Sequence, residues 1–217
     1  MKKLLLITTP VLIATAFNAS AAPSKSSTQN FSYLSGGLQV SKFNHKLPTE
    51  VNSVDNSPSD TMTGAYLRGS WNFTDNFFLE TRGDAVSKND LTISTGLLGL
   101  GYFYPVNDAF TVYGLLGGSS AEVELNLISN GNINYRETGF TGEVGARYQV
   151  MSQWTIEPAV RMANYDDNMY EYRLGNIVGL NEHVSLEGNL VHRNYTSDRA
   201  NDGIKETAYQ FGVRYSF

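Results

Sequence analysis

The residues best suited to general acid–base chemistry are the three histidines, His45, His183 and His192. A hydroxyl and an acid follow His192 at Ser197 and Asp198, and a base beside such groups can activate a nucleophile. Polar loops bring hydroxyls and acids together by chance, however. In addition, His192 falls on the same side of its alternating segment as the apolar residues. We therefore expect no enzymatic activity and assign no catalytic residue.

Asp166 and Asp167 form a second grouping, which could attract a divalent cation close to phosphate groups. Asp and Asn also favour turns for backbone reasons, and Asn168 follows directly, so we expect a turn there. The sequence has no glycine-rich phosphate loop, no zinc-ligand spacing and no nucleic-acid motif. We expect no cofactor, no metal ion and no nucleic-acid partner.

Arginines and acids recur at every second position of several segments, where they alternate with apolar side chains. Seven of the nine arginines lie on this polar side, whereas the five lysines after residue 21 lie in the tail, in loops or near segment ends. Arginine suits confined ion pairs, because its planar fork bonds carboxylates twice and is weakly hydrated. We therefore expect an enclosed ion-pair network made of Arg68, Glu80, Arg82, Asp84, Glu122, Glu124, Glu143, Arg147, Glu157, Arg161, Glu171, Arg173, Glu187, Arg193, Glu206 and Arg214.

The N-terminus has the parts of a secretory signal peptide, with Lys2-Lys3, an apolar run over 4–17 and small residues at 19–21. We predict a signal peptide over 1–21, a short periplasmic leader over 22–30 and a single barrel domain over 31–217. Without residues 1–21 the chain has 14 basic and 21 acidic residues, a net charge of −7, which disfavours nucleic acid as a partner. It has no cysteine, so no disulfide holds the fold.

Period-two alternation predicts ten strands. Tight turns and longer polar loops alternate between them, as in transmembrane barrels, with both termini on the tight-turn side. We therefore expect an all-β, transmembrane, antiparallel, up-and-down β-barrel. Two alternatives stay open: eight strands with extended extracellular hairpins, and a water-soluble barrel. The expected strands are 31–44, 61–73, 77–86, 91–104, 110–126, 135–150, 154–165, 169–180, 184–196 and 204–217.

Three expected strands fit the alternation poorly. In the first, Phe31 has the opposite parity to Leu34. In the fourth, Leu98 faces inward if Phe103 faces lipid, which predicts a bulge or a slipped register. In the seventh, Pro158 removes a ladder hydrogen bond and predicts another bulge.

Aromatic residues concentrate at strand ends, which is typical of the two belts at membrane–water interfaces. We expect one belt beside the tight turns and a second at the opposite rim. The first would contain Trp71, Phe73, Phe77, Phe103, Phe110, Tyr148, Trp154, Tyr215 and Phe217, and the second Tyr135, Tyr165, Tyr170, Tyr195 and Tyr209.

The last strand alternates up to a terminal aromatic residue. Phe211, Val213, Tyr215 and Phe217 fall on one face of it. This ending resembles the C-terminal signal by which the barrel-assembly machinery of the outer membrane recognises its substrates. We predict that these four residues are the assembly signal.

The signal peptide, the alternating strands, the tight turns, the Arg/Glu polar face and the ending Tyr215-Ser216-Phe217 together resemble the small outer-membrane β-barrel superfamily of OmpA transmembrane domains and OmpX/Ail-type proteins. The resemblance covers essentially the whole chain after residue 21. It implies a bacterial outer-membrane location with both termini in the periplasm and contact with outer-membrane lipid and lipopolysaccharide.

Three functional classes follow from this architecture. We favour a non-enzymatic envelope or surface scaffold, adhesin-like and monomeric, with a closed lumen. Its loops 45–60 and 197–203 would contact a host or phage ligand, because function in a scaffold concentrates in loops. A small-solute pore is the alternative, although a ten-stranded barrel encloses little room. A lipid A-modifying enzyme or a protease is the third class.

Overall fold

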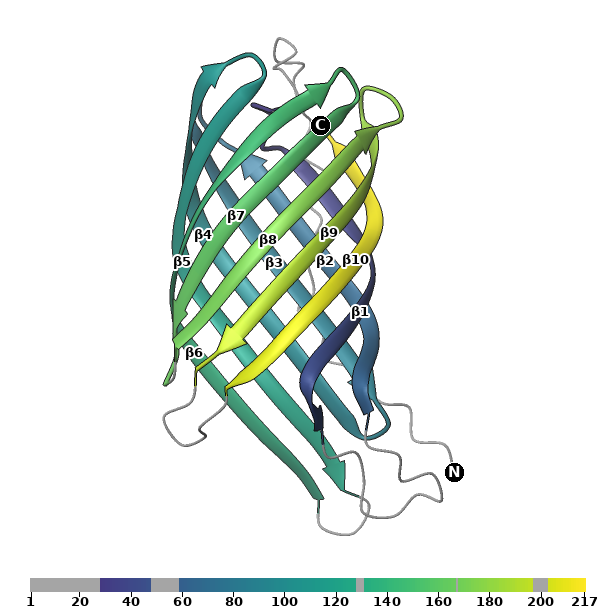
Figure 1. Ribbon diagram of the computed structural model, residues 1–217. Coiled ribbons are helices and arrows are strands. Elements are labelled where there is room, and N and C mark those ends of the chain that lie inside the picture. Colours follow the sequence, from purple (N-terminus) through teal and green to yellow (C-terminus); the bar gives the residue numbers. More distant parts are fainter. Residues whose placement is uncertain (1–27, 48–58, 128–130, 167, 197–202) are drawn as a thin grey trace.

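Ten antiparallel strands form one closed barrel, as the computed structural model shows over residues 28–47, 59–127, 131–166, 168–196 and 203–217 (Figure 1). The predicted fold class and strand number are confirmed, and the eight-stranded alternative is wrong. The strands are β1 (Tyr33–Leu47), β2 (Ser59–Asn72), β3 (Phe77–Lys88), β4 (Leu91–Asn107), β5 (Phe110–Leu127), β6 (Gly131–Met151), β7 (Trp154–Asn164), β8 (Asn168–Gly179), β9 (Val184–Tyr195) and β10 (Ile204–Ser216).

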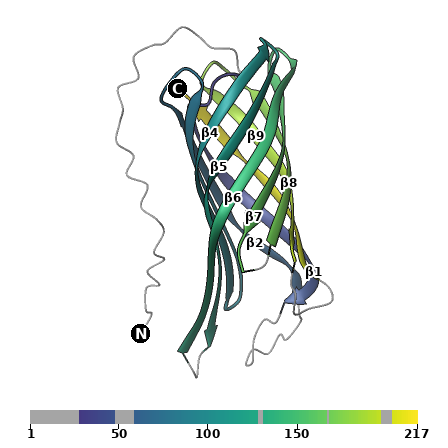
Figure 2. The ribbon, with the colours of Figure 1, turned by 90° about the vertical axis from the view of Figure 1, so that its left-hand side faces the viewer.

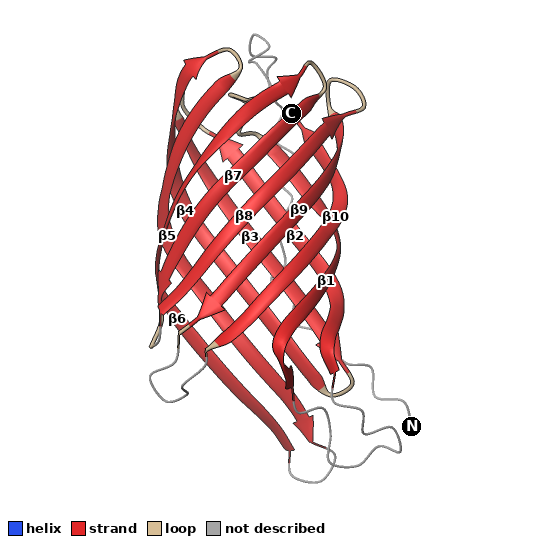
Figure 3. Cartoon of the chain, viewed as in Figure 1, coloured by secondary structure: helices blue, strands red, loops and turns tan. Residues whose placement is uncertain are grey.

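All described regular structure is strand, and the strands are joined by turns and loops (Figure 3). Among the described residues, no helix is long and apolar enough to cross a membrane. The predicted signal peptide, residues 22–27 of the leader and most of the two predicted contact loops lie outside the described residues.

The first and last strands close the barrel. β1 pairs with β10 from Tyr33 opposite Ser216, and the backbone N–H of Phe217 donates to the Ser32 carbonyl over 3.1 Å. Gly37 is required at this seam, because a Cβ atom there would lie 2.0 Å from the Phe211 carbonyl oxygen. The two backbones therefore approach closely where the chain ends meet.

Alternation sorts the side chains into an outer apolar face and an inner polar face. Leu38, Val144 and Phe211 are among the most exposed apolar residues of the outer face. Gln39 and Glu143, next to two of them in the sequence, are buried inside the barrel. This arrangement, with apolar residues outside, is the inverse of that in a water-soluble barrel and is typical of a barrel embedded in lipid.

The assignment of faces on β4 corrects one prediction. Leu98 and Leu100 face outward and are half exposed, whereas Leu97 and Phe103 are buried inside. β4 keeps one register with β3 from Leu91 to Tyr102 and with β5 from Leu91 to Pro105, so the bulge predicted within this part of the strand is absent. Leucines occupy both faces of β4, and the sequence pattern alone could not distinguish them.

The aromatic residue before β1 also faces the interior. Phe31 is fully buried in the barrel, whereas Leu34 faces outward. Pro158 interrupts the β6–β7 ladder, which lacks pairs between Gly145–Ala159 and Tyr148–Ile156. The register is the same on both sides of this gap, so the bulge predicted at Pro158 is wrong, and the shift occurs nearer the turn.

The predicted belt beside the tight turns is present in part, whereas the second belt is mostly absent, because Tyr195 packs against an interior cluster and Tyr135 has the parity that faces the lumen. Residues beside the tight turns, such as Trp71, Phe77 and Tyr215, are exposed on the outer face. Phe103 and Tyr165, assigned to the two belts, are instead buried in the interior. The aromatic residues thus divide between the lipid face and the packing of the lumen.

Candidate functional site

The lumen holds the densest group of functional side chains in the described structure. Alternation points seven arginines inward from β2, β3 and β6–β10, and six of them have side chains about 5% exposed or less. Seven carboxylates contact them, so the charges of this network balance. The arginines are Arg68, Arg82, Arg147, Arg161, Arg173, Arg193 and Arg214, and the acids are Glu80, Asp84, Glu143, Glu157, Glu171, Glu187 and Glu206.

Glu157 of β7 is the most highly connected acid. Its carboxylate oxygens lie 2.6 Å from Arg147 Nε, 3.2 Å from Arg214 Nη2, 3.3 Å from Arg68 Nη1 and 3.5 Å from Arg173 Nη1. The side chain is fully buried. A single carboxylate therefore partly compensates four arginines that reach it from β2, β6, β8 and β10.

Two phenols extend the network on the side of β1 and β5. Glu80 accepts hydrogen bonds from Arg68 Nε over 2.9 Å and from the Tyr33 hydroxyl over 3.1 Å, and it also contacts Arg82. Glu143 accepts a hydrogen bond from the Tyr113 hydroxyl over 2.9 Å and is held by the Arg82 fork at 2.6 and 2.7 Å. These tyrosines were absent from the predicted site.

A second group of ion pairs lies nearer the long loops. Glu171 contacts Arg161 Nη2 and Arg193 Nε, each over 2.8 Å. The fork of Arg193 grips Asp84 at 2.7 and 2.9 Å and reaches Glu206 at 3.1 Å. One arginine thus ties β3, β8 and β10 together from β9.

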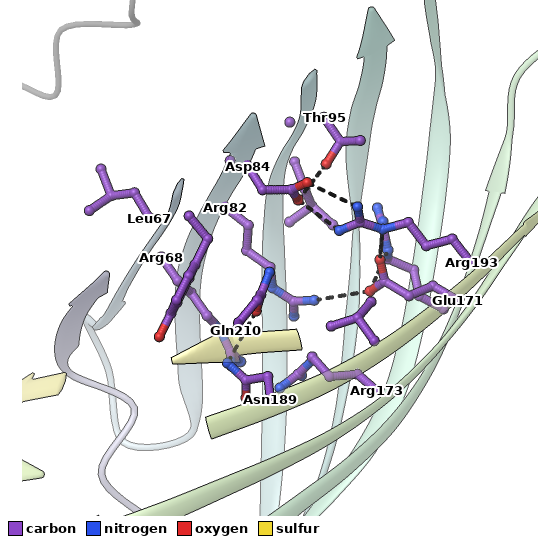
Figure 4. Close-up of a pocket in the computed structure, with 16 residues that line it drawn as sticks. Leu67, Arg68, Arg82, Asp84, Thr95, Glu171, Arg173, Asn189, Arg193 and Gln210 are labelled. Carbon is purple, nitrogen blue, oxygen red and sulfur yellow. Dashed lines mark hydrogen bonds and ion pairs between the residues drawn. The ribbon is translucent and has the colours of Figure 1, made fainter. Parts of the chain in front are cut away.

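A small cavity separates the two groups of ion pairs (Figure 4). Arg82 Nη1 links the two groups through a contact of 3.9 Å to Glu171. The cavity measures about 40 Å³, and a buried water needs about 10–15 Å³. It therefore has room for a few water molecules.

Residues 28–31, here called the plug, close the tight-turn end of the lumen. Phe31 stacks on Phe103 with ring centroids 4.5 Å apart, and the guanidinium of Arg147 lies 3.6 Å from the centroid of the Phe31 ring. Arg147 Nη1 donates to the Asn30 carbonyl over 2.6 Å, and the Thr28 hydroxyl donates to the Asp108 carbonyl over 3.1 Å. Part of the predicted leader is therefore packed inside the barrel.

Apolar residues fill the lumen towards the long loops as well. Phe43, Met62, Val86 and Leu91 form a buried cluster contributed by β1–β4. A second buried cluster, Ala163, Tyr165 and Met169, comes from the β7–β8 connection and its strands. The ion pairs thus lie between two apolar layers, which shield them from water.

Fourteen of the sixteen predicted network residues meet in the lumen, and two do not. Glu122 and Glu124 have the parity that faces outward on β5, and they lie near its outer end. Glu122 accepts a hydrogen bond from Asn134 over 2.6 Å at an exposed position. Their placement in the network was wrong, because the alternation inverts near this end of β5, where the glutamates have the outward parity and Val123 and Leu125 have the parity that faces the lumen.

Parity could have identified some of the lumen residues that sequence reasoning missed. Phe78 has the parity of Glu80 and Arg82, so its burial inside the barrel follows from the same alternation. The parity of Phe31, opposite to that of Leu34, also agrees with its inward position, but the contacts of its ring have no local signal. Its position depends on side chains of β3–β6 that only the closed barrel brings together.

The four residues of the predicted assembly signal, Phe211, Val213, Tyr215 and Phe217, all lie on the outer face of β10 and are about half exposed or more. Their exposure is compatible with recognition by another protein, which stays a prediction. The residues also form part of the lipid-facing surface beside the seam.

The candidate chemical groups outside the lumen do not form a site in the described structure. His192 contacts the Thr207 hydroxyl over 3.0 Å on the outer face, and its predicted neighbours Ser197 and Asp198 lie outside the described residues. Asp166 is exposed, and Asp167 is also outside them. Among described residues, no three His, Cys, Asp or Glu side chains are placed to hold a metal ion.

Comparison with known proteins gives a family match. The model of the outer membrane protein beta-barrel domain matches residues 9–217. No curated protein sequence matches the chain.

Several solved structures are similar at low identity. The outer membrane protease OmpT from Escherichia coli has 8% identity and a TM-score of 0.51, over 85% of this chain and 97% of its own. Ail, the attachment invasion locus protein of Yersinia pestis, has 12% identity and a TM-score of 0.43, over 87% and 99%. OprG from Pseudomonas aeruginosa has 14% identity and a TM-score of 0.40, over 88% and 98%. At these identities the likeness concerns the fold alone.

Proposed function

The chain belongs to the outer membrane protein beta-barrel domain family, and on this premise we propose that it is a non-enzymatic, monomeric envelope scaffold with a closed lumen. Its long-loop end faces the outside of the cell and contacts a host or phage surface or lipopolysaccharide, and both termini face the periplasm. The barrel wall contacts outer-membrane lipid. The barrel-assembly machinery recognises the last strand.

One observation carries this proposal: the lumen is filled along its length. The plug closes the tight-turn end, the balanced ion pairs fill the middle, and the Phe43 cluster lies towards the long loops. Only about 40 Å³ is left in the middle. A barrel filled in this way is a rigid support, so we place its function on its outer surface.

The filled lumen also argues against catalysis inside the barrel. Of the two histidines whose side chains the structure describes, neither points into it, because His183 contacts the Ser216 carbonyl beside a turn and His192 lies on the outer face. The acids of the lumen are each held by arginine and are not presented to a substrate. The proposed scaffold therefore uses its charges for structure.

Single-channel recording in planar bilayers tests the closed lumen. We expect no steady conductance from the native protein, and flickering openings from Phe31→Ala, because this change removes the ring that packs on Phe103 and Arg147. Phe77→Ala is the matched control, because its ring lies on the outer face at the same end. Steady open steps in the native protein would overturn the scaffold proposal in favour of a small-solute pore.

A further inference from the structure

The cavity between the two groups of ion pairs has a positively charged lining (Figure 4). The lumen network as a whole is balanced, but its charges are unevenly placed. Five of its arginines line the cavity against two of its acids, so the described lining has a net charge of +3. The charged residues of the lining are Arg68, Arg82, Arg161, Arg173, Arg193, Asp84 and Glu171.

Arg173 is the arginine of this lining whose hydrogen bonds are incomplete. Its Nη2 donates to the Tyr113 hydroxyl over 2.9 Å and to Glu143 over 3.1 Å, and its Nη1 makes only an ion-pair contact of 3.5 Å with Glu157. Its Nε is buried and has no hydrogen-bond partner within the described chain. Arg193, by contrast, bonds acids through all three of its nitrogens. An unbonded donor on a buried cation is costly, so we expect the cavity to hold an acceptor.

An unbonded acceptor lies on the neighbouring strand. Asn189 donates to Glu187 over 2.8 Å and to Gln210 over 3.2 Å, whereas its Oδ1 is buried without a hydrogen-bond partner in the part of the chain that the structure describes. β8 and β9 run side by side in the barrel wall (Figure 2), and Arg173 of β8 lies opposite Val191 of β9, two residues from Asn189. The contents of the cavity must therefore accept a hydrogen bond at one point and donate one at another.

Water alone could make both hydrogen bonds, but it would leave the positive lining uncompensated. The two apolar layers of the lumen shield the cavity from solvent, and charges attract an unlike charge strongly where water is excluded. The volume of about 40 Å³ exceeds the 10–15 Å³ that one water needs, so a second particle of similar size fits beside a water. A single negative charge disturbs the neutral network least.

We propose that the cavity binds one small monovalent anion, of the size of chloride or bromide, together with water. The anion accepts a hydrogen bond from Arg173 Nε, and the water donates to Asn189 Oδ1. The ion holds Arg173 in place between the two groups of ion pairs and is a part of the folded structure. This site goes beyond the proposed scaffold function, because it lies inside the barrel and does not depend on what the outer surface contacts.

Halide-dependent stability provides the first test. Protein folded in lipid vesicles is unfolded with urea in mixtures of sodium chloride and sodium gluconate at constant ionic strength, because gluconate is too large for the cavity. An anion that binds only the folded state stabilises it by mass action. Above the dissociation constant, each tenfold rise in chloride should therefore lower the unfolding constant about tenfold. An unfolding constant that does not change with chloride would mean that water alone fills the cavity, and the proposal would be wrong.

A carboxylate placed in the cavity should replace the anion. Val191 is buried in the lining directly opposite Arg173, so Val191→Asp brings a negative charge within reach of the guanidinium with little change of volume. Val191→Asn is the matched control, because it has the same shape without the charge. We expect the chloride dependence to disappear in Val191→Asp and to persist in Val191→Asn. Equal dependence in both variants and in the native protein would identify a non-specific salt effect and contradict the site.

Crystals of the native protein grown in sodium bromide locate the ion, even if Val191→Asp fails to fold. The anomalous scattering of bromide should give a peak within hydrogen-bond distance of Arg173 Nε. The absence of a lumen peak, or a peak at another place in the lumen, would contradict the site. A peak at Arg173 without any effect of halide on the unfolding constant would indicate an adventitious ion only, which would also overturn the proposal.

Discussion

Two walls of the lumen differ although both stand in the same membrane. The wall made by β4 and β5 presents apolar and aromatic side chains inward, among them Leu97, Phe103 and Leu115, and β4 contains no charged residue. The wall made by β7 and β8 presents Glu157 and Arg173 and is charged. The outer faces of both are apolar. The comparison shows that lipid requires apolar side chains on the outer face of each strand, whereas the side chains of the inner face can be apolar or charged.

The apolar wall receives the plug, and the charged wall anchors it. Phe31 packs on Phe103 and Tyr113 of the first wall, whereas Glu157 of the second wall holds Arg147 above the Phe31 ring. Buried ion pairs seldom add net stability over apolar packing, but removing one partner is costly. Substitutions should therefore act very differently on the two walls.

The largest effect is expected at the centre of the charged wall. Glu157→Gln leaves four arginines without their shared acid and should lower the free energy of unfolding by about 3–5 kcal/mol. Urea titration of the protein folded in lipid vesicles measures it. Leu115→Met, on the apolar wall, should cost less than about 1.5 kcal/mol, because it conserves volume. Similar losses in the two variants would remove the distinction between the walls.

An intermediate effect is expected on the outside of the apolar wall. Leu98→Arg places a charge on the lipid face and should cost about 2–4 kcal/mol in the same titration, if residue 98 lies near the bilayer midplane. Thr92→Arg, towards the long-loop end of β4, is the control and should cost less. Full tolerance of Leu98→Arg would contradict the outward assignment of this residue.

The smallest effect is expected where an ion pair lies outside the lumen. Lys42 Nζ and Asp60 are 3.8 Å apart with largely exposed side chains. Asp60→Asn should change the free energy of unfolding by less than about 1 kcal/mol, because water screens the pair. A loss in the free energy of unfolding as large as that of Glu157→Gln would show that burial of the lumen ion pairs is not the cause of their larger effect.

The same comparison explains what the sequence could predict. Alternation identified the ten strands and most of the network where one parity is charged and the other apolar, as on β7 and β8. It failed on β4, because leucines lie on both faces and the interior there is also apolar. It failed at Glu122 for a different reason, since near this end of β5 the charged side chains have the outward parity and apolar Val123 has the parity that faces the lumen.

A local sequence pattern could not predict the contacts between segments that are distant in the chain. The four arginines around Glu157 come from four strands, and only the closed register brings them together. The interior packing of Phe31 likewise depends on the residues that surround it. The sequence therefore predicted which side chains face inward better than it predicted which of them meet.

The position of the plug has a consequence for the order of folding. Its neighbours come from β3 to β6, and the pairing of Phe217 with Ser32 closes the barrel directly beside it. Closure joins the two ends of the barrel domain, which makes it the contact with the greatest loss of chain entropy. We therefore expect the plug to become buried only after the last strand has paired. Burial of Phe31 would then be a late step, which marks the completion of the barrel.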